Sequence, residues 1–141
     1  MSRIEEILKE MEYIAHHPAQ MVMKWKSETG KKAVGIAPIH CAEEVVHAAG
    51  MLPVGIWGGQ TTLTRASEYV QAFCCSIAKA IMELSAAGAY KHLDAIVFPE
   101  TCDTLRVIPL MMRIADPLTP VIGLVLPDNR KIPAGIEYTA N

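Results

Sequence analysis

The stretch that decides the fold is LDAIVFPETCDTLR, Leu93 to Arg106. Its first seven residues are almost entirely apolar and rich in strand-forming types, which is typical of a strand buried on both faces. After Cys102, apolar residues recur at helical spacing through DTLRVIPLMMRIAD. The cysteine therefore lies where a predicted strand gives way to a predicted helix.

The same alternation continues outward from this stretch. We expect further strands over 32–38, 51–57 and 119–127, and helices over 41–50, 63–72, 76–87 and 102–116. Pro109 inside the last helix predicts a late start or a kink. The stripe Ile4, Ile7, Leu8, Met11 and Ile14 predicts a first helix, broken at His16-His17-Pro18, and a second covers 19–29 up to Gly30. The tail from residue 128 reads as irregular.

Strands that alternate with helices predict an α/β fold built of βαβ units. Its sheet is expected to be mostly parallel, with about four strands flanked by helices. The 141 residues suit one domain, 1–141. Because no terminal element closes the core, we expect this domain to be the N-terminal part of a longer subunit.

Composition narrows the function classes. The net charge is −2, and no basic surface is predicted that would attract nucleic acid or an anionic membrane. No apolar run is long enough to span a membrane. The N-terminus MSRIEEILKEMEYI carries acids, unlike a signal peptide, so we expect a cytoplasmic, reducing location. The four cysteines are not expected to form disulfides there.

Candidate site residues follow the predicted strands, since ligands of parallel sheets collect beyond the carboxyl ends of the strands. Cys75 and Cys102 both fall at predicted helix N-termini, where unpaired N–H groups and the helix dipole stabilise a thiolate. They are small buried side chains, redox groups or metal ligands, and an iron–sulfur cluster fits better than zinc because no CxxC or HxxxH pair is present. Two cysteines are too few for a cubane cluster. His40 and Glu44, after the first strand, are weaker candidates for acid–base work; Cys41 and Cys74 fit packing better.

Three stretches carry a family resemblance: KKAVGIAPIHCAEEVVHAAGMLPVGIWGGQT, AFCCSIAKAIMEL and LDAIVFPETCDTLR. Together they resemble the 2-hydroxyacyl-CoA dehydratase family, which is related to benzoyl-CoA reductase subunits. The likeness runs over nearly the whole chain and is closest to the smaller, beta-type subunit.

The resemblance implies a cytoplasmic heterodimer with a similar larger subunit. Each subunit of such proteins has α/β domains of the flavodoxin-like or Rossmann-like kind and holds a 4Fe–4S cluster through three cysteines. Two of them match Cys75, in the CS pair, and Cys102, in TCD, while the third is expected beyond Asn141. Cys74 is the alternative to Cys75. The 141-residue piece alone is not expected to hold a stable cluster.

The implied reaction removes water from an (R)-2-hydroxyacyl-CoA to give an (E)-2-enoyl-CoA through a ketyl radical. A separate ATP-dependent iron–sulfur activator protein supplies the electron. The loop PIHCAEE lacks a Ser or Thr hydroxyl, which favours an electron-relay subunit over the substrate-side one. The alternatives are a benzoyl-CoA-reductase-type oxidoreductase subunit and a cluster-free flavodoxin-like assembly module.

Overall fold

Four strands form one parallel sheet in the computed structural model, which describes residues 2–38, 41–127, 129 and 131–140. The strands are β1 (Ala33–Ile36), β2 (Leu52–Gly55), β3 (Ala95–Pro99) and β4 (Val121–Leu124), in the spatial order β2-β1-β3-β4. All three pairings are parallel. The predicted α/β fold is confirmed, and the order is that of the first four strands of a flavodoxin-like sheet.

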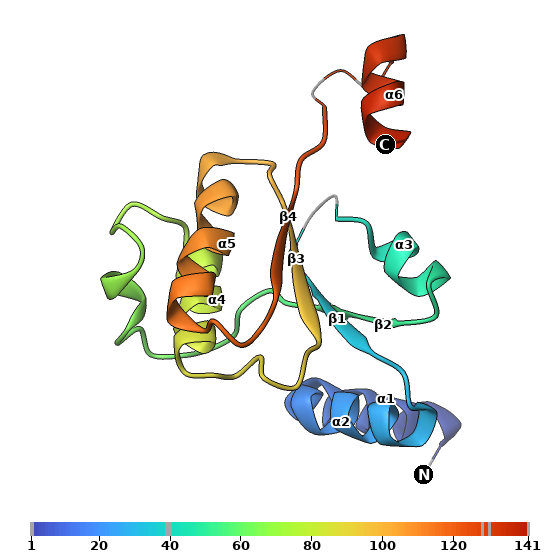
Figure 1. The fold of residues 1–141 in the computed structure, drawn as a ribbon. Helices are drawn as coiled ribbons and strands as arrows, with labels where there is room; N and C mark the ends of the chain where they lie inside the picture. The colour runs from blue at the N-terminus through green and yellow to red at the C-terminus, as the bar shows by residue number, and fades with distance from the viewer. Residues whose placement is uncertain (1, 39–40, 128, 130, 141) are drawn as a thin grey trace.

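Helices cover both faces of this sheet (Figure 1). Helix α3 (Glu43–Ala48) lies on one face, and α4 (Ser76–Ala86) and α5 (Asp103–Ala115) lie side by side on the other. The division follows from right-handed crossovers: β1 to β2 runs one way across the sheet, while β2 to β3 and β3 to β4 run the other way. Both α4 and α5 therefore begin at the carboxyl ends of the strands.

The main core lies between the sheet and the helix pair α4 and α5. Its largest fully buried side chains come from those two helices and from β3: Ile81, Met82, Ile96, Phe98, Ile108 and Met112. A smaller cluster under α3 contains Val34, Ile36 and Val46. Strand β1 is buried along its whole length, as its continuous apolar run predicted.

Two helices precede the sheet and lie at the amino ends of its strands (Figure 1). Helix α1 (Arg3–His16) starts with a capping box between Ser2 and Glu5, and α2 (Pro18–Thr29) ends at Gly30 in the left-handed conformation. The predicted break at the His-His-Pro segment is confirmed. Helix α1 has no buried residue, so its apolar stripe is exposed.

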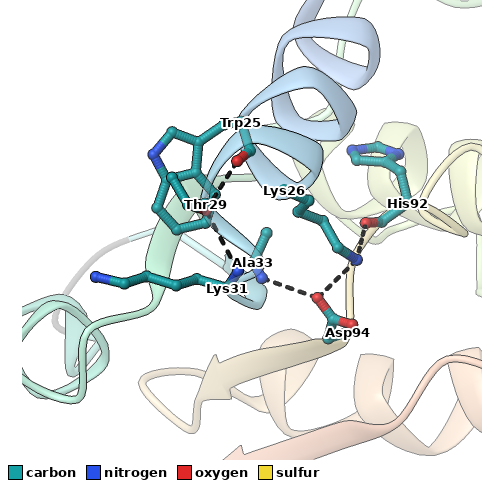
Figure 2. A network of polar contacts seen from close by, with 7 residues as sticks. All are labelled: Trp25, Lys26, Thr29, Lys31, Ala33, His92 and Asp94. Carbon is teal, nitrogen blue, oxygen red and sulfur yellow. Dashed lines mark hydrogen bonds and ion pairs between the residues drawn. The ribbon is translucent and has the colours of Figure 1, made fainter.

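A polar network fastens α2 to the start of β1 and β3 (Figure 2). Lys26 Nζ lies 2.7 Å from Asp94 Oδ2 and donates to the His92 carbonyl at 3.1 Å. The Ala33 amide donates to the same Asp94 oxygen at 2.8 Å. Burial opposes the ionisation of Asp94, but the bonds from Lys26 and Ala33 outweigh it and hold the pKa of Asp94 below its usual range.

The predicted helix over 63–72 is wrong: that segment forms turns and a single 3-10 turn, η1 (Ala66–Glu68). The reason lies in Glu83 on α4. Its Oε2 accepts from the amides of Thr64, Arg65 and Ala66 at 2.7–2.9 Å, and its Oε1 accepts from the Thr64 hydroxyl at 2.7 Å. The Thr64 hydroxyl, together with these amides, lowers the pKa of Glu83 to about 2.

Two further expectations differ from the structure. Residues 133–140 of the tail are not irregular but form helix α6 (Pro133–Ala140), which begins with a proline at a position where no amide donor is needed. It stands beyond the carboxyl end of β4 (Figure 1). Of the two alternatives for Pro109, the late start is wrong: helix α5 begins at Asp103, is capped by Cys102 and contains Pro109 in its interior.

Candidate functional site

The candidate site lies where the chain reverses direction across the sheet. From β1 the chain moves to β2 on one side, and from β2 it crosses to β3 on the other side of β1. A parallel sheet of this kind has a crevice beyond the carboxyl ends of the two central strands. Here those strands are β1 and β3, and the segments that follow them carry Cys41 and Cys102.

Cys102 is the N-cap of α5, as predicted, and its side chain is exposed. Its Sγ accepts a hydrogen bond from the Leu105 amide at 3.4 Å. On either side of the cysteine, Glu100 Oε2 and Arg106 Nε form an ion pair at 3.2 Å. The sulfur is thus accessible and is oriented by an amide donor.

Cys75 occupies the corresponding place on the neighbouring helix. It is the N-cap of α4 with an extended backbone, it is exposed, and its side chain makes no capping hydrogen bond. Lys79, one turn along α4, donates from Nζ to the carbonyl oxygen of Ala72 in the preceding loop. Both predicted helix N-terminal positions are therefore confirmed, and both sulfurs are available to a ligand.

The other two thiols are less exposed and lie as donors beside protein oxygens. Cys74 is buried in the main core, near Gln71 Oε1. Cys41 packs against the smaller cluster and donates from Sγ to the Val97 carbonyl at 3.6 Å. Burial raises the pKa of the Cys41 thiol against the lowering effect of the Ala42 amide. A neutral thiol that donates to a carbonyl serves packing better than metal binding.

Two cavities adjoin this end of the sheet, and Trp57 lines both. One of about 180 Å³ is lined by Ile36, Ala37, Pro38, Cys41, Glu43, Pro53, Gly55 and Trp57. Glu44, the predicted candidate, is exposed in the first turn of α3 and does not line it, whereas Glu43 does. The other candidate, His40, lies outside the described residues.

The second cavity, of about 360 Å³, lies beside the start of α4 and is lined by Trp57, Gly58, Gly59, Ser76, Ile77 and Ala80. Gly58 has a φ of +79°, and a Cβ built on it would lie 2.8 Å from the Ala80 Cβ. Only glycine combines this backbone conformation with such a close approach. The loop after β2 is thus held directly against the first turns of the helix that Cys75 caps.

Comparison with known proteins shows the family of this chain. The sequence profile of the family described as 2-hydroxyglutaryl-CoA dehydratase, D-component, matches residues 38–141, which include the central strand β3 and all four cysteines. The chain belongs to this dehydratase family.

Individual relatives of this dehydratase-family chain carry related names. It is 43% identical over 139 residues to the lactoyl-CoA dehydratase subunit beta of Anaerotignum propionicum, covering 98% of this chain and 36% of the relative. It is 35% identical over 138 residues to the (R)-phenyllactyl-CoA dehydratase beta subunit of Clostridium sporogenes, covering 98% of this chain and 37% of that relative. A more distant relative, one of the benzoyl-CoA reductase subunits of Thauera aromatica, is 27% identical over 141 residues, and the match covers 98% of this chain and 35% of that relative. The chain spans about a third of the length of these relatives.

The dehydratase-family chain offers two thiols suited to an iron–sulfur cluster. Cys75 and Cys102 are exposed N-caps, and Cys102 already accepts the kind of amide hydrogen bond that tunes cluster sulfurs. Among the described residues, no three or more His, Cys, Asp or Glu side chains are grouped to hold a metal ion. No helix in the described ranges is both long and apolar enough to cross a membrane.

Proposed function

We propose that this chain forms the N-terminal domain of the beta-type subunit of an (R)-2-hydroxyacyl-CoA dehydratase, in which Cys75 and Cys102 are two ligands of a 4Fe–4S cluster. The observation that supports this most directly is the pair of exposed cysteines at the N-caps of α4 and α5. The two helices pack side by side and start at the same end of the sheet. The third cysteine ligand would come from beyond Asn141.

The chain's own groups would stabilise the anionic ligands. Each sulfur lies at the positive end of a helix dipole, and the Leu105 amide donates directly to Cys102 Sγ. The buried neighbour Cys74 belongs to the core, so Cys75 is the ligand we propose from the adjacent pair. When bound, the cluster would supply one-electron chemistry that these side chains cannot provide.

In the proposed complex, a similar larger subunit binds this one, and an ATP-dependent iron–sulfur activator protein delivers the electron. The substrate would be an (R)-2-hydroxyacyl-CoA, and the product its (E)-2-enoyl-CoA. We assign the electron-relay role to this subunit because the segment PIHCAEE after β1 contains no Ser or Thr hydroxyl, which a substrate-side subunit would use. The proposed location is the cytoplasm.

A benzoyl-CoA-reductase-type activity is a second candidate, favoured only by the 27% identity to a subunit of that enzyme. An assay of the full-length protein with its partner and activator distinguishes the two by the amount of reductant consumed per product formed. Net dehydration without consumption of reductant supports the dehydratase. Consumption of reductant in proportion to product supports the reductase.

The cluster ligands are tested by the iron and acid-labile sulfide content of the full-length subunit, purified without oxygen. Cys75→Ala and Cys102→Ala should each lose most of the iron, while the matched variants Cys74→Ala and Cys41→Ala keep it. Full iron in the first pair, or loss from Cys41→Ala, would show that other thiols bind the cluster. A colourless wild-type protein without iron would instead support the alternative of a cluster-free assembly module.

A further inference from the structure

The two N-cap cysteines are followed by the same arrangement of charge. The segments are CSIAK, 75–79, and CDTLR, 102–106, so that a basic residue lies four positions after each cysteine. On a helix, residues four apart lie on the same face, one turn from each other. Lys79 and Arg106 are therefore positioned on the faces of α4 and α5 that carry the cysteines.

Lys79 and Arg106 each contact the loop that precedes the cysteine of their helix. Lys79 Nζ donates to the carbonyl of Ala72, three residues before Cys75. Arg106 Nε pairs at 3.2 Å with Glu100, two residues before Cys102, and the Arg106 amide bonds to the Cys102 carbonyl. In each case the charged group reaches from the helix back to the loop that precedes its cysteine.

This placement is electrostatically unfavourable for the helices alone. The N-terminus of a helix is its positive end, so a cation held there is repelled unless an anion lies nearby. Glu100 provides such an anion for Arg106, but the hydrogen-bond partner of Lys79 is a neutral carbonyl. At α4, whose first turn contains no acidic residue, the compensating negative charge would come from what Cys75 binds; at α5, Glu100 and Asp103 already supply part of it.

We infer that Lys79 and Arg106 are positioning residues that hold positive charge beside Cys75 and Cys102 and raise the reduction potential of the cluster bound there. The inference rests on the proposed function, because it needs a cluster on these sulfurs. Reduction adds one electron and makes the cluster more negative, so a nearby cation stabilises the reduced form more than the oxidised form. Glu100 offsets part of this effect at Cys102.

The test is the midpoint potential of the cluster in the full-length subunit, measured by redox titration followed by electron paramagnetic resonance, with iron content determined on the same samples. Lys79→Met and Arg106→Met should each lower the potential. At the wild-type midpoint, the ratio of reduced to oxidised cluster should fall about threefold, the effect of one unit charge several ångströms away across a water-like dielectric. Glu100→Gln removes a negative charge and should raise the potential.

Three control variants separate charge from structure. Lys79→Arg and Arg106→Lys keep the charge and should keep the wild-type potential. Lys24→Met removes the same charge from an exposed position on α2, at the opposite end of the sheet, and should change nothing. If Lys79→Met or Arg106→Met loses its cluster, the shift in Glu100→Gln still tests the electrostatic effect.

The outcomes distinguish this inference from the proposed function. Full iron with an unchanged potential in Lys79→Met, Arg106→Met and Glu100→Gln would overturn the role of the cations and leave the cluster assignment standing. A shift of the same size in Lys24→Met would also overturn it. Wild-type protein without iron would overturn the proposed function itself.

Discussion

Replacing Gly58 by alanine tests how the loop after β2 is held against α4. Gly58 has a φ of +79°, which costs an L-residue about 1–2 kcal/mol. The added Cβ would also lie 2.8 Å from the Ala80 Cβ and 3.4 Å from the Ile77 carbonyl oxygen, both on the helix. Overpacking of this kind costs about 1–3 kcal/mol. We therefore expect Gly58→Ala to lower the free energy of unfolding by about 2–5 kcal/mol, a large share of an ordinary domain's stability.

Gly30 provides a matched control. Its φ is +68°, but nothing lies within 4 Å of a Cβ built there, so Gly30→Ala should cost only the backbone term of about 1–2 kcal/mol. The assay is urea unfolding followed by circular dichroism. In the double variant Gly58→Ala/Ala80→Gly, the steric part of the lost free energy of unfolding should be recovered. The cost of Ala80→Gly alone, about 1 kcal/mol for a glycine inside a helix, is measured separately and subtracted. Equal losses for Gly58→Ala and Gly30→Ala would refute the close-approach argument.

Two carboxylates predict how stability depends on pH. The pKa of Glu83 is about 2 in the folded chain against an ordinary value of 4.5, so its ionised form contributes stability that is complete above about pH 4.5 and is lost as the pH falls toward 2. Glu83→Gln should flatten the acid limb of the melting temperature against pH; an unchanged limb would contradict this. The pKa of Asp94 is also lowered, so Lys26→Met should raise it, as measured by carboxyl NMR titration, and should move acid unfolding to higher pH. No movement of the Asp94 resonance would show that Lys26 does not hold that charge.

Much of the site region was predictable because its signals are local. The apolar run of β3, the helical spacing after Cys102 and the capping position between them all lie within Leu93 to Arg106. The same holds for Cys75, which directly precedes the apolar spacing of α4. Separating Cys75 from buried Cys74 required the structure, since the direction of each side chain depends on how the preceding loop turns.

The failure over 63–72 came from a partner that is distant in the sequence. Leu63, Ala66 and Val70 have helical spacing, yet the amides of residues 64–66 bond to Glu83, which is 17 to 19 positions away. The cavities beside Trp57 depend on the strand order, which brings the loop after β2 close to α3 and α4. Local spacing contains no information about such contacts.

The polar network around Asp94 constrains how a newly made chain can assemble. Ala33 and Asp94 are 61 positions apart, and Lys26 and His92 are 66 apart. A ribosome adds about 5–20 residues per second, so β1 and α2 wait about 3–13 s for their partners to be synthesised. During that interval the central strand has an unpaired edge and an apolar surface open to solvent. Synthesis speed through this segment therefore sets how long the nascent protein is exposed to aggregation.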